Sequence, residues 1–203
     1  MSKSKFTKVY QFKVALKGIK PLILRRILVP ENYSFWDLHV AIQDAMGWDD
    51  YHLHEFRLKQ PNTKQEFYIG LPDDSGLGRK ILPDWKNFIA DWFTIDNKAA
   101  EYTYDFGDTW EHSVTLEKIL PAESKSKYPK CIAGKQACPP EDCGGIDGYY
   151  EVVEATNNPK HERHEELLEW LGGEPFDPEA FDPSWVKFDN PDKRLKYALS
   201  RKI

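Results

Sequence analysis

The chain has 203 residues, of which 40% are hydrophobic, 14% aromatic and 30% charged. A chain of this length can bury a substantial core, and its aromatic content excludes a disordered, collagen-like or coiled-coil protein. No apolar run approaches the roughly 20 residues that a membrane span needs, and the first residues lack the apolar stretch of a secretory signal. We therefore predict a cytoplasmic protein that forms a single domain over residues 1–203, without a membrane partner.

The net charge is −5, but the charged residues are distributed unevenly along the chain. Residues 1–30 contain eight Lys and Arg and no acidic residue, whereas residues 141–192 contain fifteen Asp and Glu against three Lys and Arg. The basic arm fits the solvent face of an edge strand, contacts with nucleic-acid phosphates, or contacts with the acidic region of the same fold. The acidic region argues against a protein that coats a duplex over a broad face. The residues that would contact phosphate are Lys3, Lys5, Lys8, Arg25 and Arg26.

Strand and helix periodicities follow one another at the start of the chain. Residues 10–16 alternate between apolar and polar side chains, and residues 22–29 form a second apolar run that stops at Pro30, which predicts a β-hairpin. Helical spacing comes next, with Ser34 as the N-cap and Gly47 just past the last turn.

Further strands are predicted at residues 52–58 and 65–71, followed by a short helix at 84–92. Residues 121–145 are rich in Cys, Pro and Gly and are predicted to be an irregular loop. The remaining periodic segments are predicted helices at 147–157, 161–171 and 191–200.

Two more strands are predicted around Gly107, in the segment AEYTYDFGDTWEHSVTLEKIL. A two-residue turn would place the apolar side chains of these strands on opposite faces of the sheet. A three-residue loop, 107–109, pairs Phe106 with Trp110 and Tyr104 with His112, so we predict the longer loop.

This order of elements predicts an α+β fold. We expect a mostly antiparallel β-sheet with one helix between strand pairs and a C-terminal group of helices packed on the sheet. Within the single domain, residues 1–120 would be the sheet-rich part, 121–145 the loop and 146–203 the helical part.

Three cysteines, Cys131, Cys138 and Cys143, lie within thirteen residues. In a cytosolic protein, an odd and clustered set indicates metal or redox chemistry more than a disulfide framework. The spacing is looser than in zinc knuckles, and the local sequence supplies no fourth ligand. A zinc cofactor is therefore one interpretation, and buried inert thiols or a Cys131–Cys138 disulfide formed in air are the others.

Two groups of carboxylates flank turns. Glu141 and Asp142 lie in the segment PPEDCGG, which would either contribute to a cation site or dock the C-terminal helices. Asp105, Asp108 and Glu111 lie near the predicted hairpin loop, where Asp105 would oppose Glu111. A like-charge pair of this kind favours a bound cation, unless the side chains simply point into water.

Histidines form the last candidate group, with His39 on the predicted helix, His52 and His54 at strand spacing, and His112 on a later strand. Imidazoles spaced in this way occur in metal sites, but a histidine on an apolar face is also typical of a hydrogen-bonded core residue. No P-loop, dinucleotide-binding glycine motif or nucleophile elbow is found, which argues against common nucleotide-dependent and acyl-transfer enzymes.

Four segments taken together, LILRRILVP, FWDLHVAIQDAMGWDDYHLHEF, YTYDFGDTWEH and CPPEDCGGIDGYYE, resemble the plasmid pRiA4b ORF-3-like family. The resemblance implies a prokaryotic, cytoplasmic α+β domain, often encoded on plasmids or beside insertion elements, and it implies no established reaction. Some members carry a resolvase-like label, from which this sequence departs because it has no recombinase-type serine context and no helix-turn-helix. The family motifs fall on Trp36, His39, Gly47, Trp48, His52, His54, Asp105, Gly107, Asp108, Trp110, His112, Pro139, Pro140, Glu141, Asp142, Gly144, Gly145 and Tyr149.

The leading hypothesis is a binding module of mobile-element type, which would bind nucleic acid or protein through a polar-aromatic surface. A second hypothesis is a metal-dependent hydrolase in which His and Asp or Glu hold the ion, and a third is a structural interaction protein. The expected site residues are His52, His54, Asp105, Asp108, Trp110, His112, Glu141 and Asp142.

Overall fold

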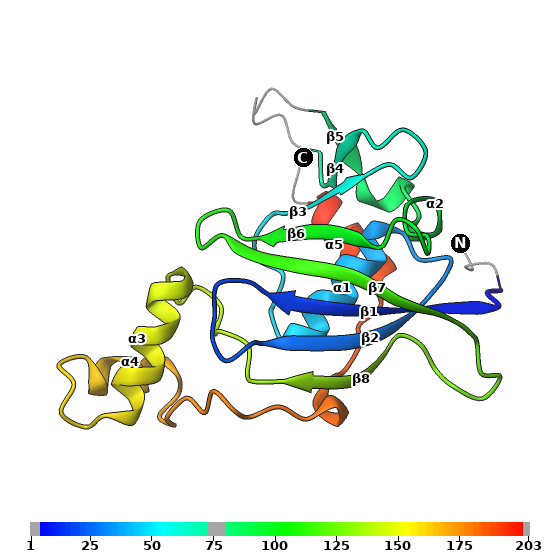
Figure 1. Ribbon diagram of the computed structural model, residues 1–203. Coiled ribbons are helices and arrows are strands. Elements are labelled where there is room, and N and C mark those ends of the chain that lie inside the picture. Colours follow the sequence, from blue (N-terminus) through cyan, green and yellow to red (C-terminus); the bar gives the residue numbers. More distant parts are fainter. Residues whose placement is uncertain (1–4, 73–79, 201–203) are drawn as a thin grey trace.

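A computed structural model describes residues 5–72 and 80–200, so Lys3 of the predicted basic arm lies outside the described residues. Within these ranges, eight strands form one sheet in the order β5-β4-β3-β6-β7-β1-β2-β8 (Figure 1). The strands are β1 (Lys8–Leu16), β2 (Leu24–Pro30), β3 (His54–Lys59), β4 (Glu66–Gly70), β5 (Ile81–Pro83), β6 (Ala99–Tyr104), β7 (Trp110–Pro121) and β8 (Lys130–Lys135). The helices are α1 (Phe35–Met46), α2 (Ile89–Trp92), α3 (Gly145–Asn157), α4 (His164–Trp170) and α5 (Pro191–Ser200), with 3₁₀ turns η1 (Asp84–Lys86) and η2 (Pro183–Trp185).

Strand pairing is antiparallel throughout the sheet except between β4 and β5, which run parallel. The predicted hairpin of β1 and β2 is present, and the predicted helix at residues 84–92 is divided into η1 and α2. The α+β fold with a mostly antiparallel sheet is confirmed.

Helix α1 begins and ends where the sequence predicts. Ser34 accepts a hydrogen bond from the backbone N of Asp37, whose side chain accepts one from the backbone N of Ser34, so both halves of a capping box are present. Gly47 ends the helix in the left-handed conformation, at φ 95°, which favours glycine. All residues of α1 except Asp44 are buried.

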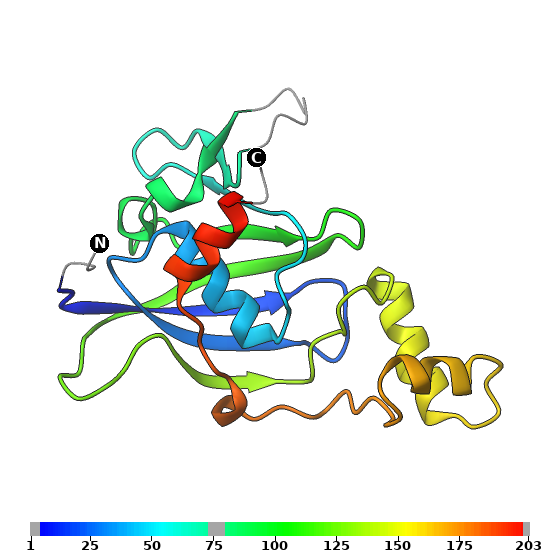
Figure 2. The same cartoon turned by 180° about the vertical axis from the view of Figure 1, so that it is seen from behind.

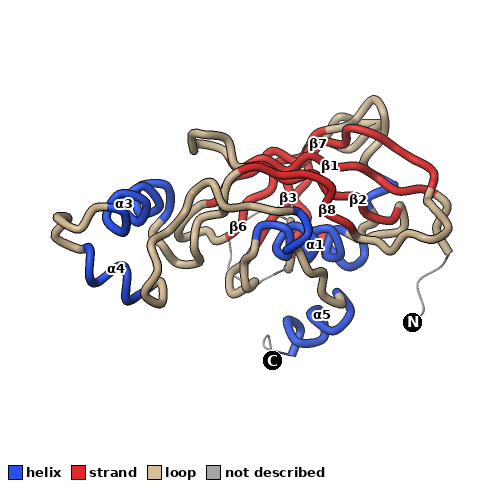
Figure 3. The backbone as a smooth tube through the Cα atoms, turned by 90° about the horizontal axis from the view of Figure 1, so that it is seen from below, coloured by secondary structure: helices blue, strands red, loops and turns tan. Residues whose placement is uncertain are grey.

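Helices α1 and α5 lie on one face of the sheet (Figures 2 and 3). Helix α1 lies against the strands and α5 packs on the outer side of α1, while α3 and α4 pack against each other beyond the end of the sheet. Aromatic side chains fill the space between α1 and the sheet, with the rings of Phe12 and Phe93 4.8 Å apart and those of Phe35 and Phe56 5.1 Å apart. In the described ranges, no helix has the length and apolar character needed to cross a membrane.

The hairpin of β6 and β7 has a different register from the predicted one. Tyr104 lies opposite Trp110, so the loop contains five residues, 105–109, and the predicted pairing of Phe106 with Trp110 and of Tyr104 with His112 is wrong. Asp105 causes the difference, because it adopts a positive φ of 54° and its carbonyl accepts a hydrogen bond from Thr109 N at 2.6 Å. The observed register differs from the predicted one by two residues, which leaves each side chain on its predicted face. Tyr102, Tyr104, Trp110 and His112 therefore still share one face, and all four are buried.

The expected opposition of Asp105 and Glu111 is wrong for the same reason. Glu111 pairs with Thr103, and Asp105 is buried in the loop. No like-charge pair therefore strains this hairpin.

Strand β8 lies within residues 121–145, which the sequence predicted to be an irregular loop. It pairs with β2 and forms the edge of the sheet, and Cys131 lies on it. Strands β1 and β2 are consequently interior strands, so the prediction that the basic arm forms an edge strand is wrong.

Two charges of the basic arm are paired with acidic residues on the open face of the sheet, opposite α1. Lys17 pairs with Glu101 at 2.8 Å, and Arg26 Nε pairs with Glu117 at 2.9 Å. Within the described residues, each of these two ion pairs spans one intervening strand, β7 for Lys17–Glu101 and β1 for Arg26–Glu117, and neither reaches the acidic C-terminal region.

Arg25 contradicts its predicted contact with phosphate, because its side chain points to the other face and only 1% of the residue is exposed. Its guanidinium donates to the carbonyls of Ala45, Leu24 and Lys135 and lies 3.6 Å from the ring centroid of Phe181. Arg25 is therefore a structural residue that joins β2 to α1, β8 and the C-terminal segment.

The capping box generates a stability prediction. Ser34→Ala removes the side-chain acceptor for Asp37 N, and we expect the free energy of unfolding to fall by about 1 kcal/mol. Ser124→Ala, in an exposed turn, is the matched control and should change it by less than about 0.5 kcal/mol. Urea unfolding of both variants measures the difference, and equal effects would show that the cap does not stabilise α1.

Candidate functional site

Three of the predicted site residues meet at one end of the sheet, and we call His52, Asp105 and Asp142 the exposed cluster. They come from the loop before β3, the loop after β6 and the loop before α3. His52 Nε2 lies 2.7 Å from Asp142 Oδ1 and 3.6 Å from Asp105 Oδ2. One ligand atom from each residue lies within 4.8 Å of the others.

Local backbone structure holds the two carboxylates of the exposed cluster in place. Asp105 and Asp142 both have positive φ, at 54° and 56°, a conformation that Asp tolerates better than most residues. Asp105 Oδ1 accepts a hydrogen bond from Gly107 N, which leaves Oδ2 directed at His52. The predicted Asp108 joins the two loops instead of the cluster, because its carboxylate accepts a hydrogen bond from Gly144 N at 3.1 Å.

Glu141 lies beside the exposed cluster, in the predicted PPEDCGG loop. Its carboxylate accepts hydrogen bonds from the hydroxyl of Tyr104 and from Asp49 N. Burial raises the pKa of Glu141 above its ordinary value. Burial, followed by the bond to Glu141, also raises the pKa of Tyr104, so the phenol stays protonated and acts as the donor.

A second group lies in the core between α1 and the sheet, and we call His39, Asp50 and His54 the buried cluster. Ligand atoms of these three residues also lie within 4.8 Å of one another. The rings of His39 and His54 are stacked with centroids 3.4 Å apart and planes 7° apart. His39 Nε2 lies 2.8 Å from Asp50 Oδ1, and His54 Nε2 lies 2.8 Å from Oδ2 of the fully buried Asp84.

Tyr102 of β6 completes the polar environment of the buried cluster. Its hydroxyl lies 2.8 Å from His39 Nδ1 and accepts a hydrogen bond from Gln43 Nε2 at 2.9 Å. Four fully buried side-chain atoms nearby have no hydrogen-bond partner among the described residues: His54 Nδ1, Asp84 Oδ1, Gln43 Oε1 and His112 Nε2.

The predicted Trp110 and His112 belong to the packing under the site. Trp48 lies over both of them, with ring centroids 6.0 Å from Trp110 and 5.4 Å from His112, and its indole donates to the carbonyl of Pro139. His112 is fully buried, and burial lowers its pKa to about 4, so it is neutral near pH 7. These residues hold the 139–145 loop against the sheet.

The cysteines are free thiols, and none of them belongs to a group of three potential ligands within the described ranges. Burial raises the pKa of all three thiols, that of Cys143 to about 12. Raised pKa values disfavour the thiolate form that binds metal. Cys131 is buried, and Cys138 and Cys143 are half-buried.

Asp50, Asp84, Gln43 and Tyr102 were not among the predicted site residues. Asp50 lies in the segment WDDYHLH, where an acidic pair beside two histidines was an available signal. Asp84 had no such signal, because it is thirty residues from His54 and reaches it only through the parallel pairing of β4 with β5.

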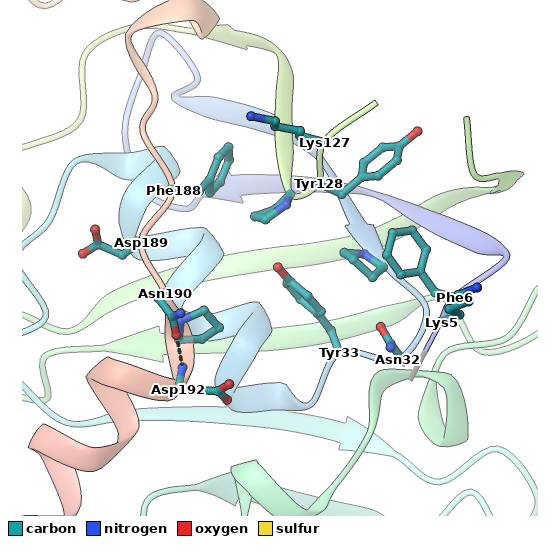
Figure 4. Close-up of a pocket in the computed structure, with 13 residues that line it drawn as sticks. Lys5, Phe6, Asn32, Tyr33, Lys127, Tyr128, Phe188, Asp189, Asn190 and Asp192 are labelled. Carbon is teal, nitrogen blue, oxygen red and sulfur yellow. Dashed lines mark hydrogen bonds between the residues drawn. The ribbon is translucent and has the colours of Figure 1, made fainter. Parts of the chain in front are cut away.

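A groove of about 880 Å³ lies at the other end of β1, where the N-terminal segment begins (Figures 1 and 4). Phe6 and Tyr128 meet edge to face on one wall, beside the two cations Lys5 and Lys127. The segment 188–192 forms the opposite wall. The groove combines ring surfaces with two cations, Lys5 and Lys127, and two carboxylates, Asp189 and Asp192, and it shares no lining residue with either cluster.

Comparison with known proteins gives a consistent result. A family model described as Plasmid pRiA4b ORF-3-like protein matches residues 8–185. The chain is 36% identical over 190 residues to the uncharacterized protein y4hQ of Sinorhizobium fredii (strain NBRC 101917 / NGR234), and the match covers 94% of each chain. The crystal structure of MM3350, a protein of unknown function from Methanosarcina mazei Go1, matches with a TM-score of 0.83 and 50% identity, over 91% of this chain and 100% of that one. The range matched by the family model contains every residue of both clusters.

The neutral His112 generates a pH prediction. The unfolded chain binds the proton below about pH 6.5 and the folded chain only below about pH 4, so folding stability falls as the pH drops through this window. His112→Asn keeps a side-chain donor near the carbonyl of Tyr102 but has no group that titrates. Between pH 7 and pH 4 we expect the variant to lose about 3 kcal/mol less than the wild type in urea unfolding. Equal losses would show that His112 is not held neutral.

Proposed function

The chain belongs to the plasmid pRiA4b ORF-3-like family, and for this member we propose a metal-dependent hydrolase whose divalent ion is held by the exposed cluster. The observation that supports the proposal is the convergence of His52, Asp105 and Asp142 from three separate segments, with ligand atoms within 4.8 Å of one another. One imidazole nitrogen and two carboxylate oxygens form a ligand set that suits Zn²⁺, Mn²⁺ or Fe²⁺.

Solvent access favours a catalytic ion over a structural one. The side chains of His52 and Asp142 are 32% and 61% exposed, whereas that of Asp105 is 10% exposed. Three protein ligands on an accessible surface leave coordination positions for water and substrate. An ion in such a site lowers the pKa of its bound water and makes it a nucleophile at neutral pH.

Glu141 supplies a carboxyl group that can accept the proton of the attacking water and pass it to the leaving group. Burial raises the pKa of its carboxyl above the ordinary value, and carboxyl groups are common general acids and bases in enzymes. Tyr104 and Asp49 N fix the carboxylate beside Asp142, so it stays near the ion without being one of the three ligands.

The hydrolase proposal is tested with two variants and a matched control. We expect His52→Ala and Asp142→Asn to lose bound metal and to lower kcat by a factor on the order of 100, because each removes a ligand. Asn also tolerates the positive φ of position 142, so the fold is retained. His161→Ala, in the helical part, should keep both metal and activity.

The measurements are metal content by elemental analysis of tag-free protein and hydrolysis of p-nitrophenyl phosphate, bis-p-nitrophenyl phosphate and p-nitrophenyl acetate. Wild-type protein without a stoichiometric ion, or hydrolysis that survives His52→Ala, would overturn the proposal.

Single-stranded nucleic-acid binding is the second candidate function, and the groove at the other end of β1 favours it. Ring faces such as those of Phe6 and Tyr128 are platforms for base stacking, and Lys5 and Lys127 beside them provide charge for phosphates. In this proposal Lys5 and Lys127 contact the phosphates, since Arg25 is buried and Arg26 is paired with Glu117.

The groove predicts a specific salt dependence. In the double variant Lys5→Ala and Lys127→Ala, we expect affinity for oligo(dT) to fall and the slope of log K against log salt to decrease by about 1.4, which is about 0.7 for each lost contact. Lys160→Ala, on the exposed helical part, is the control and should change neither. Fluorescence anisotropy at several salt concentrations measures both quantities, and absence of binding at low salt would exclude this function.

A further inference from the structure

We propose that the cavity between α3 and α4 is the substrate pocket of the exposed cluster, and that it binds an alkyl chain ending in an ammonium group. The substrate class is carboxylic esters and amides whose acyl chain carries that amine. The role in hydrolysis rests on the proposed function, whereas amine binding by the cavity does not depend on it.

The first argument is position. The cavity has a volume of about 340 Å³ and lies at two helices that pack against each other beyond the end of the sheet (Figure 3). Asp142, a residue of the exposed cluster, is also one of the residues that line this cavity. A volume of this size is at the small end of the range for ligand pockets, so the cavity fits one chain or ring. A ligand that fills it contacts Asp142 and therefore lies next to the exposed cluster.

The second argument is the apolar lining. Val152 of α3 and Leu167 of α4 are 2% and 6% exposed, and they belong to the small core that joins the two helices. Trp170, at the end of α4, lines the same cavity but is 46% exposed. Among aromatic side chains, the face of a Trp ring attracts an ammonium group most strongly. The lining therefore suits a ligand with an apolar body and a cationic end.

The third argument is charge. Among the described residues that line the cavity, Arg163 is the one cation, and the carboxylates of Glu151 and Glu166 both bind its guanidinium. Two carboxylates share one positive charge, so one negative charge is left over. An ammonium group on the ligand balances that charge, whereas a phosphate group is repelled.

The thiol of Cys143, which also lines the cavity, is subject to the same negative field. Burial raises its pKa, and the nearby carboxylates of Asp108 and Asp142 raise it further, to about 12. A field that opposes the thiolate stabilises a cation at the same place.

Hydrolysis of this substrate class needs no reactant besides water. Water adds to the carbonyl carbon, the bond from that carbon to the leaving oxygen or nitrogen breaks, and the leaving atom takes up the proton that the water loses. The ammonium end stays in the cavity throughout, so it contributes binding and orientation but does not react.

Amine binding is measured first, on wild-type protein in a buffer with a chelator, by calorimetric titration with hexylamine and with its neutral analogue hexan-1-ol. We expect hexylamine to bind more tightly than hexan-1-ol. Trp170→Ala should weaken hexylamine binding by about 2- to 5-fold.

Two further variants test the carboxylates. The double variant Glu151→Gln and Glu166→Gln should weaken hexylamine binding by on the order of 10-fold, because it removes both negative charges while Gln still offers Arg163 an acceptor. Glu165→Gln, on the same helix but outside the cavity lining, is the matched control and should leave binding unchanged.

The role in hydrolysis is measured with a matched pair of esters, p-nitrophenyl 6-aminohexanoate and p-nitrophenyl hexanoate. We expect kcat/KM to be about 10-fold higher for the amino ester, through a lower KM, because the ammonium group is bound equally in the ground state and the transition state. In the double Gln variant this preference should disappear, while kcat for the hexanoate ester stays unchanged.

Failure of this inference is distinguishable from failure of the hydrolase proposal. Hexylamine that binds no better than hexan-1-ol, or equally well in wild type and the double Gln variant, overturns the cavity as an amine site. Hydrolysis of both esters with equal kcat/KM overturns the substrate class and leaves the hydrolase proposal standing. Amine binding that responds to the variants, in a protein that hydrolyses neither ester, supports the amine site and overturns its role in hydrolysis.

Discussion

The burial of polar side chains on α1 is the constraint on which the rest of the structure depends. This helix is covered on nearly every side, yet it carries His39 and Gln43 into the core, where polar groups need partners. Both side chains meet the hydroxyl of Tyr102 on β6. The Tyr102 hydroxyl therefore fixes the rotation of α1 against the sheet. The same contact fixes the position of Gly47, where the helix ends and the segment that carries residues of both clusters begins.

Residues 48–54, the loop that leads from α1 into β3, contribute to both clusters. Asp50 and His54 turn into the core, whereas His52 between them turns toward the surface. Trp48 anchors the start of the segment to the carbonyl of Pro139, and Asp49 N donates to Glu141. The loop before α3 thus supplies Asp142 to the exposed cluster and also holds the segment that builds the buried cluster, so the two clusters are mechanically linked although they share no residue.

Sequence patterns predicted the elements whose causes lie within a few residues. The hairpin of β1 and β2 follows from alternation, and α1 follows from Ser34 and Gly47, so both were predicted correctly. Strand β8 was missed because its six residues are stabilised by pairing with β2, more than a hundred residues away, and not by their own pattern. The β6–β7 register was missed because the turn depends on the backbone conformation of Asp105. For the site, all three residues of the exposed cluster were among the predicted site residues. Asp84 and Tyr102 were not predicted, because no sequence pattern shows that their elements lie beside the histidines in the fold.

The C-terminal segment of the chain covers the buried cluster, whose residues all come from earlier in the chain. Arg25 holds the ring of Phe181, and Trp36 donates its indole N–H to the carbonyl of Pro191 at the start of α5. The ring of Trp36 lies 5.2 Å from that of His39 and 5.9 Å from that of His54, so the docking of α5 fixes an indole beside both imidazoles. Arg194 of α5 adds an ion pair with Asp44 of α1 at 3.1 Å. Because this cover keeps water away from the imidazoles, electrostatic interactions within the buried cluster are stronger than they would be at the surface. Undocking of α5 would admit water and weaken the electrostatic interactions within the buried cluster.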